Sequence, residues 1–162
     1  MGSKEQKPIR ALQPGEAIPF ELLLLADETK EAIGRYLHGA SLYVWEEAEK
    51  IVGVYVLAIT GPRQCEIMNI AVAREWQGRG IGFHLLTHAI TTARDMGFRW
   101  LDVGTSNAAW GPLYLYQKAG FEIDRIRKHF YRDHYPVPIF ENRLLLNHMI
   151  VLRKALQDTD EG

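Results

Sequence analysis

The order of the elements that the sequence predicts indicates a mixed α/β (α+β) sheet rather than a purely doubly wound fold. One strand and two helices come first, a run of three strands follows, and only then do helices and strands alternate. The 162 residues are the size of one compact domain, and 47% hydrophobic with 24% charged residues is typical of globular proteins. We therefore expect a single domain over residues 1–162, with residues 1–7 either disordered or a cloning remnant.

The first half of the chain predicts a strand, two helices and three further strands. Pro8 suits the start of an edge strand because it lacks a backbone N–H donor, and Pro19 suits the first turn of a helix. The second helix has apolar residues at helical spacing and ends near Gly39, while the strands are β-branched and aromatic runs separated by turn residues. In order, the elements are a strand at 8–13, helices from Pro19 and over 27–40, a hairpin of strands at 41–46 and 51–60, and a strand at 65–73.

The second half begins with the longest helix. Its apolar stripe starts at Ile81 and stops at Gly97, and a later helix starts with a good cap residue and ends at Gly120. Alternation of apolar and polar residues then predicts an exposed strand, and the last apolar run is either a closing strand or a helix. In order, the elements are a helix from 81 to 96, a strand at 98–106, a helix at 107–120, a strand at 121–132, an irregular loop at 133–142 and a final run at 143–156.

Charge and cysteine usage exclude several classes of partner. The 19 basic and 20 acidic side chains leave a formal charge of -1, which provides no overall field to hold nucleic acid or an anionic membrane. The single cysteine, Cys65, excludes an internal disulfide and a cysteine metal cluster, which fits a reducing cytoplasm. The longest apolar run, at 22–26, is far shorter than the roughly 20 residues that span a bilayer. We expect a cytoplasmic protein with neither nucleic acid nor membrane as a partner.

Three glycines within residues 77–82, QGRGIG, lie between a predicted strand and the longest helix. Glycine lets the backbone turn sharply, and the unpaired N–H groups and positive dipole of a helix start attract an anion such as pyrophosphate. A P-loop is excluded because no Lys precedes a Ser or Thr here, and a Rossmann fingerprint places Phe83 where its third glycine belongs. From the glycines alone, a tight turn without a ligand remains an equal alternative.

Two segments together resemble one family. QGRGIG fits the pattern Q/R-x-x-G-x-G/A and resembles the acetyl-CoA pyrophosphate loop of GNAT superfamily N-acetyltransferases, of the small single-domain bacterial type. Residues 107–122 are similar to the family segment N-x-x-A-x-x-L-Y-x-K-x-G-F, except that Trp110-Gly111-Pro112 interrupts the usual helix start. The resemblance implies a central, mostly antiparallel sheet of six to seven strands, splayed at the cofactor site, with about four helices.

The resemblance also implies which residues bind acetyl-CoA. In the family, the strand before the loop binds the pantetheine arm, and the N–H at the position of Val72 points at the thioester carbonyl, where it stabilises an oxyanion. Asn107 is similar to a residue that contacts the pantetheine amide, with capping of the following helix as the alternative. No metal is implied, and the cofactor-binding residues are Ile70, Ala71, Val72, Gln77, Gly78, Arg79, Gly80, Ile81, Gly82 and Asn107.

Glu66 and Tyr116 are the catalytic residues that the resemblance implies. Glu66 lies eleven residues before Gln77, where the histone-acetylating branch carries its general base. An alkyl ammonium has a pKa of about 10, so a base must remove a proton, although water alone can serve and Glu66 can instead be a solvent-facing carboxylate. Tyr116 is similar to the general acid that protonates the departing thiolate. Tyr114 competes for this role but faces another side of the helix.

Three further residues carry chemistry that we assign to packing. Cys65 adjoins Glu66 but faces the opposite side of its strand, so we expect a core thiol rather than a nucleophile. His84 and His88 have the i, i+4 spacing of metal ligands, but no third ligand accompanies them. We expect both histidines to pack on the surface.

The resemblance implies an acetyl-CoA-dependent N-acetyltransferase that moves an acetyl group to a primary amine by direct attack in a ternary complex. A small cationic amine is favoured over a peptide or protein, because the expected acceptor segments, 20–38 and 131–143, are rich in carboxylates and tyrosines. Plain solvation explains the same residues. The alternative function is a non-catalytic acyl-CoA-binding or regulatory module, which the interruption before Leu113 motivates. Exposed edge strands allow a homodimer.

Overall fold

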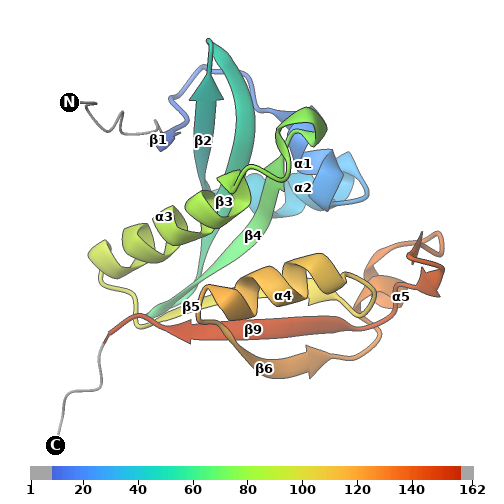
Figure 1. The fold of residues 1–162 in the computed structure, drawn as a ribbon. Coiled ribbons are helices and arrows are strands. Elements are labelled where there is room, and N and C mark those ends of the chain that lie inside the picture. Colours follow the sequence, from blue (N-terminus) through green and yellow to red (C-terminus); the bar gives the residue numbers. More distant parts are fainter. Residues whose placement is uncertain (1–8, 158–162) are drawn as a thin grey trace, which may run out of the picture. The chain divides into compact units, whose positions relative to one another are not determined.

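A computed structural model describes residues 9–157, which fall into two compact units (Figure 1). The first unit comprises the residues up to Ile59 together with Ile67–Ala89, and the second comprises Thr60–Glu66 and the residues from Ile90 onward. Residues 1–7 and Pro8, for which we expected disorder or a cloning remnant and a strand start, lie outside the described residues. A single domain over the whole chain stays a prediction.

The first unit combines a meander of strands with three helices. β2 pairs antiparallel with both β1 and β3, and Trp45, Val54 and Leu85 are among its fully or almost fully buried side chains. The elements that begin in this unit are β1 (Ile9–Ala11), α1 (Phe20–Ala26), α2 (Lys30–Leu37), β2 (Ser41–Glu47), β3 (Lys50–Gly61), the 3-10 turn η1 (Arg74–Trp76) and α3 (Ile81–Asp95). β4 (Gln64–Val72) enters this unit at Ile67.

The predicted hairpin of β2 and β3 is confirmed, but its turn has an unusual sequence. Glu47 pairs with Lys50, so only Ala48 and Glu49 form the connection. Both have positive φ, at 48° and 64°, as a two-residue turn that matches the strand twist requires. Neither residue is the Asn or Gly usual at such positions, and the buried apolar face of the two strands specifies the register instead.

In the second unit, the last strand in the sequence lies between two earlier strands. β9 (Met149–Ala155) pairs antiparallel with β5 (Trp100–Ser106) on one side and with β6 (Glu122–Arg127) on the other, and α4 (Trp110–Lys118) runs along these strands (Figure 1). Strand pairing gives the order β1-β2-β3-β4-β5-β9-β6 for the seven strands of the main sheet. The mixed, mostly antiparallel fold that the sequence predicts is confirmed.

Three predictions in the second unit need correction or completion. The strand expected over 121–132 ends at Arg127, because His129 takes a left-handed φ of 59° and a short helix, α5 (Phe130–His134), follows. The loop expected at 133–142 includes one strand of a second small hairpin, β7 (Phe140–Glu141) with β8 (Leu144–Leu145). The final run is a strand and not a helix, although only from Met149. No helix within residues 9–157 is long and apolar enough to cross a membrane.

Gly53 in β3 lies in close contact with side chains at the start of α3, and this close packing requires a residue without a Cβ. A Cβ there would lie 3.0 Å from Leu85 Cδ1 and 3.3 Å from Ile81 Cγ2, both on α3. We expect Gly53→Ala to destabilise the protein by about 1–3 kcal/mol, because overpacked cores shift side chains and backbone. Gly34→Ala is the control: a Cβ there meets nothing within 4 Å, and glycine weakens a helix by roughly 0.5–1 kcal/mol. Urea unfolding should therefore move in opposite directions in the two variants; a neutral Gly53→Ala would contradict the close contact.

Candidate functional site

Two glycines, rather than three, form the sharp turn between β4 and α3. Gly78 and Gly80 have φ of 76° and 82°, a region that residues with a Cβ rarely adopt, whereas Gly82 lies inside the first turn of α3 and is absent from the positive-φ residues. A Cβ on Gly78 would meet nothing within 4 Å, so the backbone itself requires this glycine and the space above it is open. The turn thus presents bare backbone.

Side chains of the loop itself hold this turn in place. Gln77 Nε2 donates to the carbonyl oxygen of Val72 over 3.0 Å, which ties the loop back to the end of β4. Arg79 donates to the carbonyl oxygen of Glu75 over 3.2 Å, and its guanidinium lies 4.6 Å from the ring centroid of Trp76. Both side chains therefore shape the loop, and both remain on its exposed surface.

The start of α3 adds unpaired backbone N–H groups beside the loop. The amide of His84 donates to the carbonyl oxygen of Gly80, which is the first bond of the helix, and buried Ile81 anchors it. N–H groups in the first turn of an α-helix have no partner within the helix, so those of Ile81 and Gly82 face the loop. Fifteen residues of aligned peptide dipoles in α3 add a positive potential at this end.

Asn69 in β4 is a polar residue of the site that sequence reasoning missed. Its side chain is buried, and Nδ2 donates to the carbonyl oxygen of Leu23 and to the hydroxyl of Tyr36, each over 2.9 Å. Oδ1 is the one buried side-chain oxygen or nitrogen in residues 9–157 without a hydrogen bond. Burial raises the pKa of Tyr36, so its phenol stays neutral. The signal was present: Asn69 interrupts an otherwise apolar strand core.

Glu66 lies on the part of β4 that belongs to the second unit. Burial raises the pKa of its carboxyl, and the negative charge of Asp102 raises it further, while Arg127 and Arg125 oppose the shift. A carboxylate with a raised pKa holds a proton more strongly, so it is a better base near neutral pH than an exposed glutamate. The raised pKa is the property that a general base needs.

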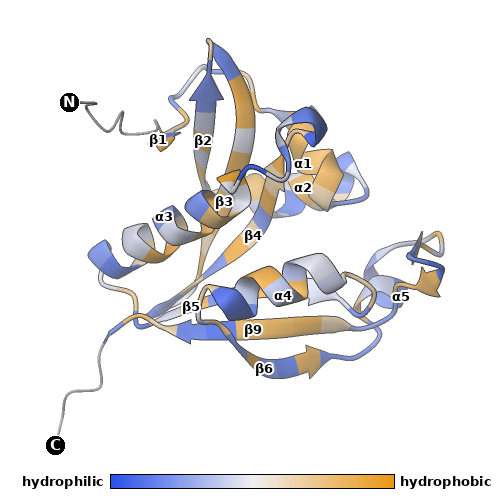
Figure 2. Ribbon diagram, viewed as in Figure 1, coloured by the Kyte–Doolittle hydropathy of each residue, from blue (hydrophilic) through white to orange (hydrophobic). Residues whose placement is uncertain are grey.

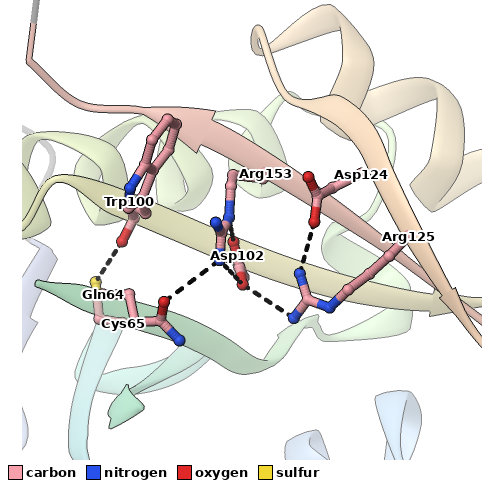
Figure 3. A network of polar contacts seen from close by, with 7 residues as sticks. All are labelled: Gln64, Cys65, Trp100, Asp102, Asp124, Arg125 and Arg153. Carbon is pink, nitrogen blue, oxygen red and sulfur yellow. Dashed lines mark hydrogen bonds and ion pairs between the residues drawn. The ribbon is translucent and has the colours of Figure 1, made fainter. Parts of the chain in front are cut away.

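The charge beside Glu66 is held by a polar network that the sequence did not reveal (Figure 3). Asp102, only 2% exposed, accepts from Arg153 Nε over 2.7 Å and from Arg153 Nη2 over 3.1 Å. Arg125 Nη2 donates to the same carboxylate over 3.2 Å, and its Nη1 donates to Asp124 over 2.8 Å. Two guanidinium groups on one buried carboxylate hold the side chain of Asp102 in a fixed position.

Tyr116 and Tyr114 on α4 differ sharply in environment. Tyr116 is 5% exposed and its ring centroid lies 6.3 Å from that of Phe121, whereas Tyr114 is 69% exposed. Burial raises the pKa of Tyr116, which keeps its hydroxyl protonated and able to donate. Trp110-Gly111-Pro112 does not disrupt the helix, because these residues form its first turn, where proline is tolerated.

Asn107 does not cap α4. The helix starts at Trp110 with Ala109 before it, so the capping alternative is wrong. Instead, Asn107 Oδ1 accepts from the amides of Asn147 over 2.9 Å and His148 over 3.2 Å, and Nδ2 donates to the carbonyl oxygen of Leu145 over 3.1 Å. The side chain thereby fixes the segment before β9, and one Nδ2 hydrogen remains for a ligand.

The residues assigned to packing behave as predicted. Cys65 is fully buried, its Sγ lies 3.7 Å from the carbonyl oxygen of Trp100, and burial raises its pKa to about 12, so it is a core thiol. His84 packs against Trp45 with ring centroids 5.8 Å apart. His88 Nδ1 is hydrogen-bonded to the hydroxyl of Tyr55 at 2.7 Å. Residues 9–157 contain no cluster of three potential metal ligands.

The two units divide the predicted site residues between them. The first unit brings together the end of β4, the loop and the start of α3. These are Ile70, Ala71, Val72, Gln77, Gly78, Arg79, Gly80, Ile81 and Gly82. The second unit carries Glu66, Asn107 and Tyr116.

Comparison with known proteins gives consistent matches. The sequence model described as "Acetyltransferase (GNAT) family" matches residues 10–121. The chain is 39% identical over 133 residues to an uncharacterized N-acetyltransferase, YvbK, of Bacillus subtilis, covering 82% of this chain and 86% of YvbK. A GNAT family acetyltransferase from Elizabethkingia anophelis, solved with acetyl-CoA bound, shares 44% identity with a TM-score of 0.90 over 92% of this chain and 97% of that one. An IAA acetyltransferase from Bacillus cereus shares 44% identity with a TM-score of 0.87 over 92% and 99%.

The raised pKa of Glu66 predicts a pH-dependent cost in stability. Stability from the protonated carboxyl is fully present below the unfolded pKa of about 4.3 and is lost as pH rises through the folded pKa. Glu66→Gln should therefore unfold at a higher temperature than the native chain at pH 8, with the gap shrinking toward pH 5. Each kcal/mol corresponds to roughly 2–4 °C in a chain of this size.

Glu21→Gln provides the control for this comparison, because Glu21 is an exposed glutamate. Thermal unfolding of the three proteins at several pH values is the measurement. A gap between Glu66→Gln and the native chain that does not change with pH would show that Glu66 carries no buried charge.

Proposed function

Because the chain belongs to the GNAT acetyltransferase family, we propose that it moves the acetyl group of acetyl-CoA to a primary amine by direct attack in a ternary complex. Family membership makes it an acetyl-CoA-dependent N-acetyltransferase. The observation that carries the proposal is the left-handed backbone of Gly78 and Gly80 at the start of α3. It provides an exposed row of N–H groups beside a helix dipole, as a pyrophosphate requires.

The residues of the loop fit this ligand. The open space at Gly78 accommodates phosphate oxygens, and Arg79 adds a positive charge whose guanidinium is already oriented by Trp76. When bound, acetyl-CoA supplies an activated acetyl thioester. Ile70, Ala71 and Val72 would hold the pantetheine arm along β4, and the amide of Val72 would donate to the carbonyl that is attacked.

Glu66 is proposed to remove the proton from the acceptor ammonium, directly or through a water molecule. Its raised pKa supports this assignment, since a base works best when its pKa approaches the working pH. Asp102, fixed by Arg153 and Arg125, contributes to that raised pKa. Arg127 and Arg125 oppose the shift, because their positive charge favours the carboxylate form of Glu66.

Tyr116 is proposed to donate a proton to the departing sulfur. The phenol is neutral and its side chain is buried, so the hydroxyl keeps a proton that it can donate. Asn107 has one amide hydrogen left after its three bonds to the segment before β9, and this hydrogen would contact the pantetheine amide.

A small cationic amine is the acceptor that we favour. Tyr36 hydrogen-bonds both Asn69 and Asp27, and Asn69 Oδ1 is an acceptor without a partner. A neutral phenol, a carboxylate and an amide oxygen are a set that suits an ammonium group. The non-catalytic alternative rested on the interruption near Trp110. These residues form a regular first turn of α4, so that reason for the alternative no longer applies.

Thiol release from acetyl-CoA over an acceptor panel tests the proposal. The panel should contain polyamines, aminoglycosides, free and peptide-borne lysine, and IAA, because a similar protein of Bacillus cereus is named an IAA acetyltransferase. We expect turnover with a small polycationic amine. Binding of acetyl-CoA without turnover on any amine would overturn the proposed reaction.

Gly78→Ala is the variant that tests the loop. Alanine in the left-handed region costs about 1–2 kcal/mol, so the loop relaxes and acetyl-CoA affinity should fall roughly tenfold. Gly15→Ala is a matched control, because Gly15 has φ of 88° and equally open surroundings but lies outside the loop. It should lose similar stability with no change in affinity by calorimetry. Equal affinities in the two variants would remove the loop from acetyl-CoA binding.

Tyr116→Phe tests the general acid. We expect kcat to fall on the order of 100-fold, because a positioned proton donor contributes about 10²–10⁴. The affinity for acetyl-CoA should change little, since the ring and its packing on Phe121 remain. Tyr114→Phe removes an exposed hydroxyl two residues away and should leave kcat unchanged. The reverse pattern would assign the proton donor to Tyr114.

A further inference from the structure

β6 is an edge strand that presents both charge and apolar surface. It pairs with β9 on one side only, and its other side has no strand partner among residues 9–157 (Figure 1). All six residues of Glu122–Arg127 are exposed, including Ile123 at 54% and Ile126 at 57%. Hydrophilic and apolar stretches follow each other along the strand (Figure 2). Such an edge is a ready template for another strand.

The sequence of this strand, EIDRIR, is complementary to itself when read in the opposite direction. Antiparallel pairing of two copies places Glu122 opposite Arg127 and Ile123 opposite Ile126. At the centre, Asp124 meets Arg125. Every charge therefore faces an opposite charge and each isoleucine faces an isoleucine, which are the cross-strand pairs that stabilise a sheet.

In a regular strand this pairing would fail. Residues that are five positions apart, such as Glu122 and Arg127, point to opposite faces of a regular strand, whereas residues that face each other across two strands must share a face. The register with β9 shifts between Ile123 and Arg125, so Asp124 is an extra residue. This β-bulge changes the alternation by one position.

With the bulge, the faces agree. Glu122 and Arg127 lie opposite Arg153 and Met149 of β9, which are four residues apart and share one face. Ile123 and Ile126 lie opposite Leu152 and Ile150, which are two residues apart and share the other face. Asp124 and Arg125 then occupy the centre together and already form an ion pair of 2.8 Å within one chain.

We propose that β6 binds β6 of a second copy of this chain, about a two-fold axis through the Asp124–Arg125 centre. A bulge normally protects an edge from other strands, because a regular strand cannot stay in register beside it. A second copy carries the same extra residue at the same place. It is therefore the partner that matches this edge in register, charge and apolar pairing.

The proposed interface is small, since it rests on two six-residue strands. Stable interfaces bury about 1,200–2,000 Å² in total, so we expect a weak, reversible dimer that increases with protein concentration. Opposed charges at its rim make the dimer weaker at high salt. Sedimentation velocity over a concentration series at low and high salt measures both properties.

Charge reversal provides the decisive test. Glu122→Arg gives a copy with Arg at both 122 and 127, and Arg127→Glu gives a copy with Glu at both, so each variant alone should be monomeric because like charges then face each other. An equimolar mixture restores both pairs and should dimerise as the native chain does. Lys128→Glu replaces a positive charge by a negative one, as Arg127→Glu does, but one residue beyond the strand. It should leave dimerisation unaltered.

The mixture also controls for folding, because recovery of the dimer requires that both variants fold. A native chain that stays monomeric throughout the series would overturn the proposal. Dimerisation of either single variant as strong as that of the native chain would overturn it too, because the dimer would then use another surface. A mixture that remains monomeric although both variants show native circular dichroism would have the same meaning.

Discussion

The left-handed backbone at Gly78 and Gly80 is the constraint on which the proposed chemistry depends. It lets a buried strand end and a helix begin within a few residues, so that strand amides and helix amides face the same loop. Gln77 and Arg79 brace the turn through the carbonyl oxygens of Val72 and Glu75. The proposed binding of a phosphate ester would therefore depend mainly on the geometry of the loop backbone, with Arg79 adding a positive charge.

Much of this arrangement follows from sequence patterns because local chemistry dictates it. Two glycines before an apolar helix, β-branched runs and the spacing from Glu66 to Gln77 are local signals, and the fold they indicate is the one found. The contacts of Asn107 and Asp102 were not predictable, because their partners lie 23 to 51 residues away along the chain. The α5 helix was missed for another reason: its short length gives no periodicity to detect.

Burial and charge act against each other around the proposed base. A carboxylate that is easily ionised is a weak base, and one that is fully buried stays protonated, so a useful pKa lies between these limits. Asp102 and burial raise the pKa of Glu66, while Arg125 and Arg127 lower it. Arg125 also binds Asp102 and Asp124, so this one side chain links the charge near the base to the bulged strand at the edge of the sheet.

The central position of β9 affects the order in which the strands can pair while the chain is being synthesised. β5 and β6 have no partner in each other, because β9, the last strand in the sequence, lies between them and pairs with both. During synthesis from the N-terminus, the strands at 100–106 and 122–127 must therefore wait, with their inner edges unpaired, until residues 149–155 have left the ribosome. The first unit has local hairpin contacts and no such delay. A nascent chain would then form the loop at residues 77–82 before Tyr116, on α4, reaches its final setting.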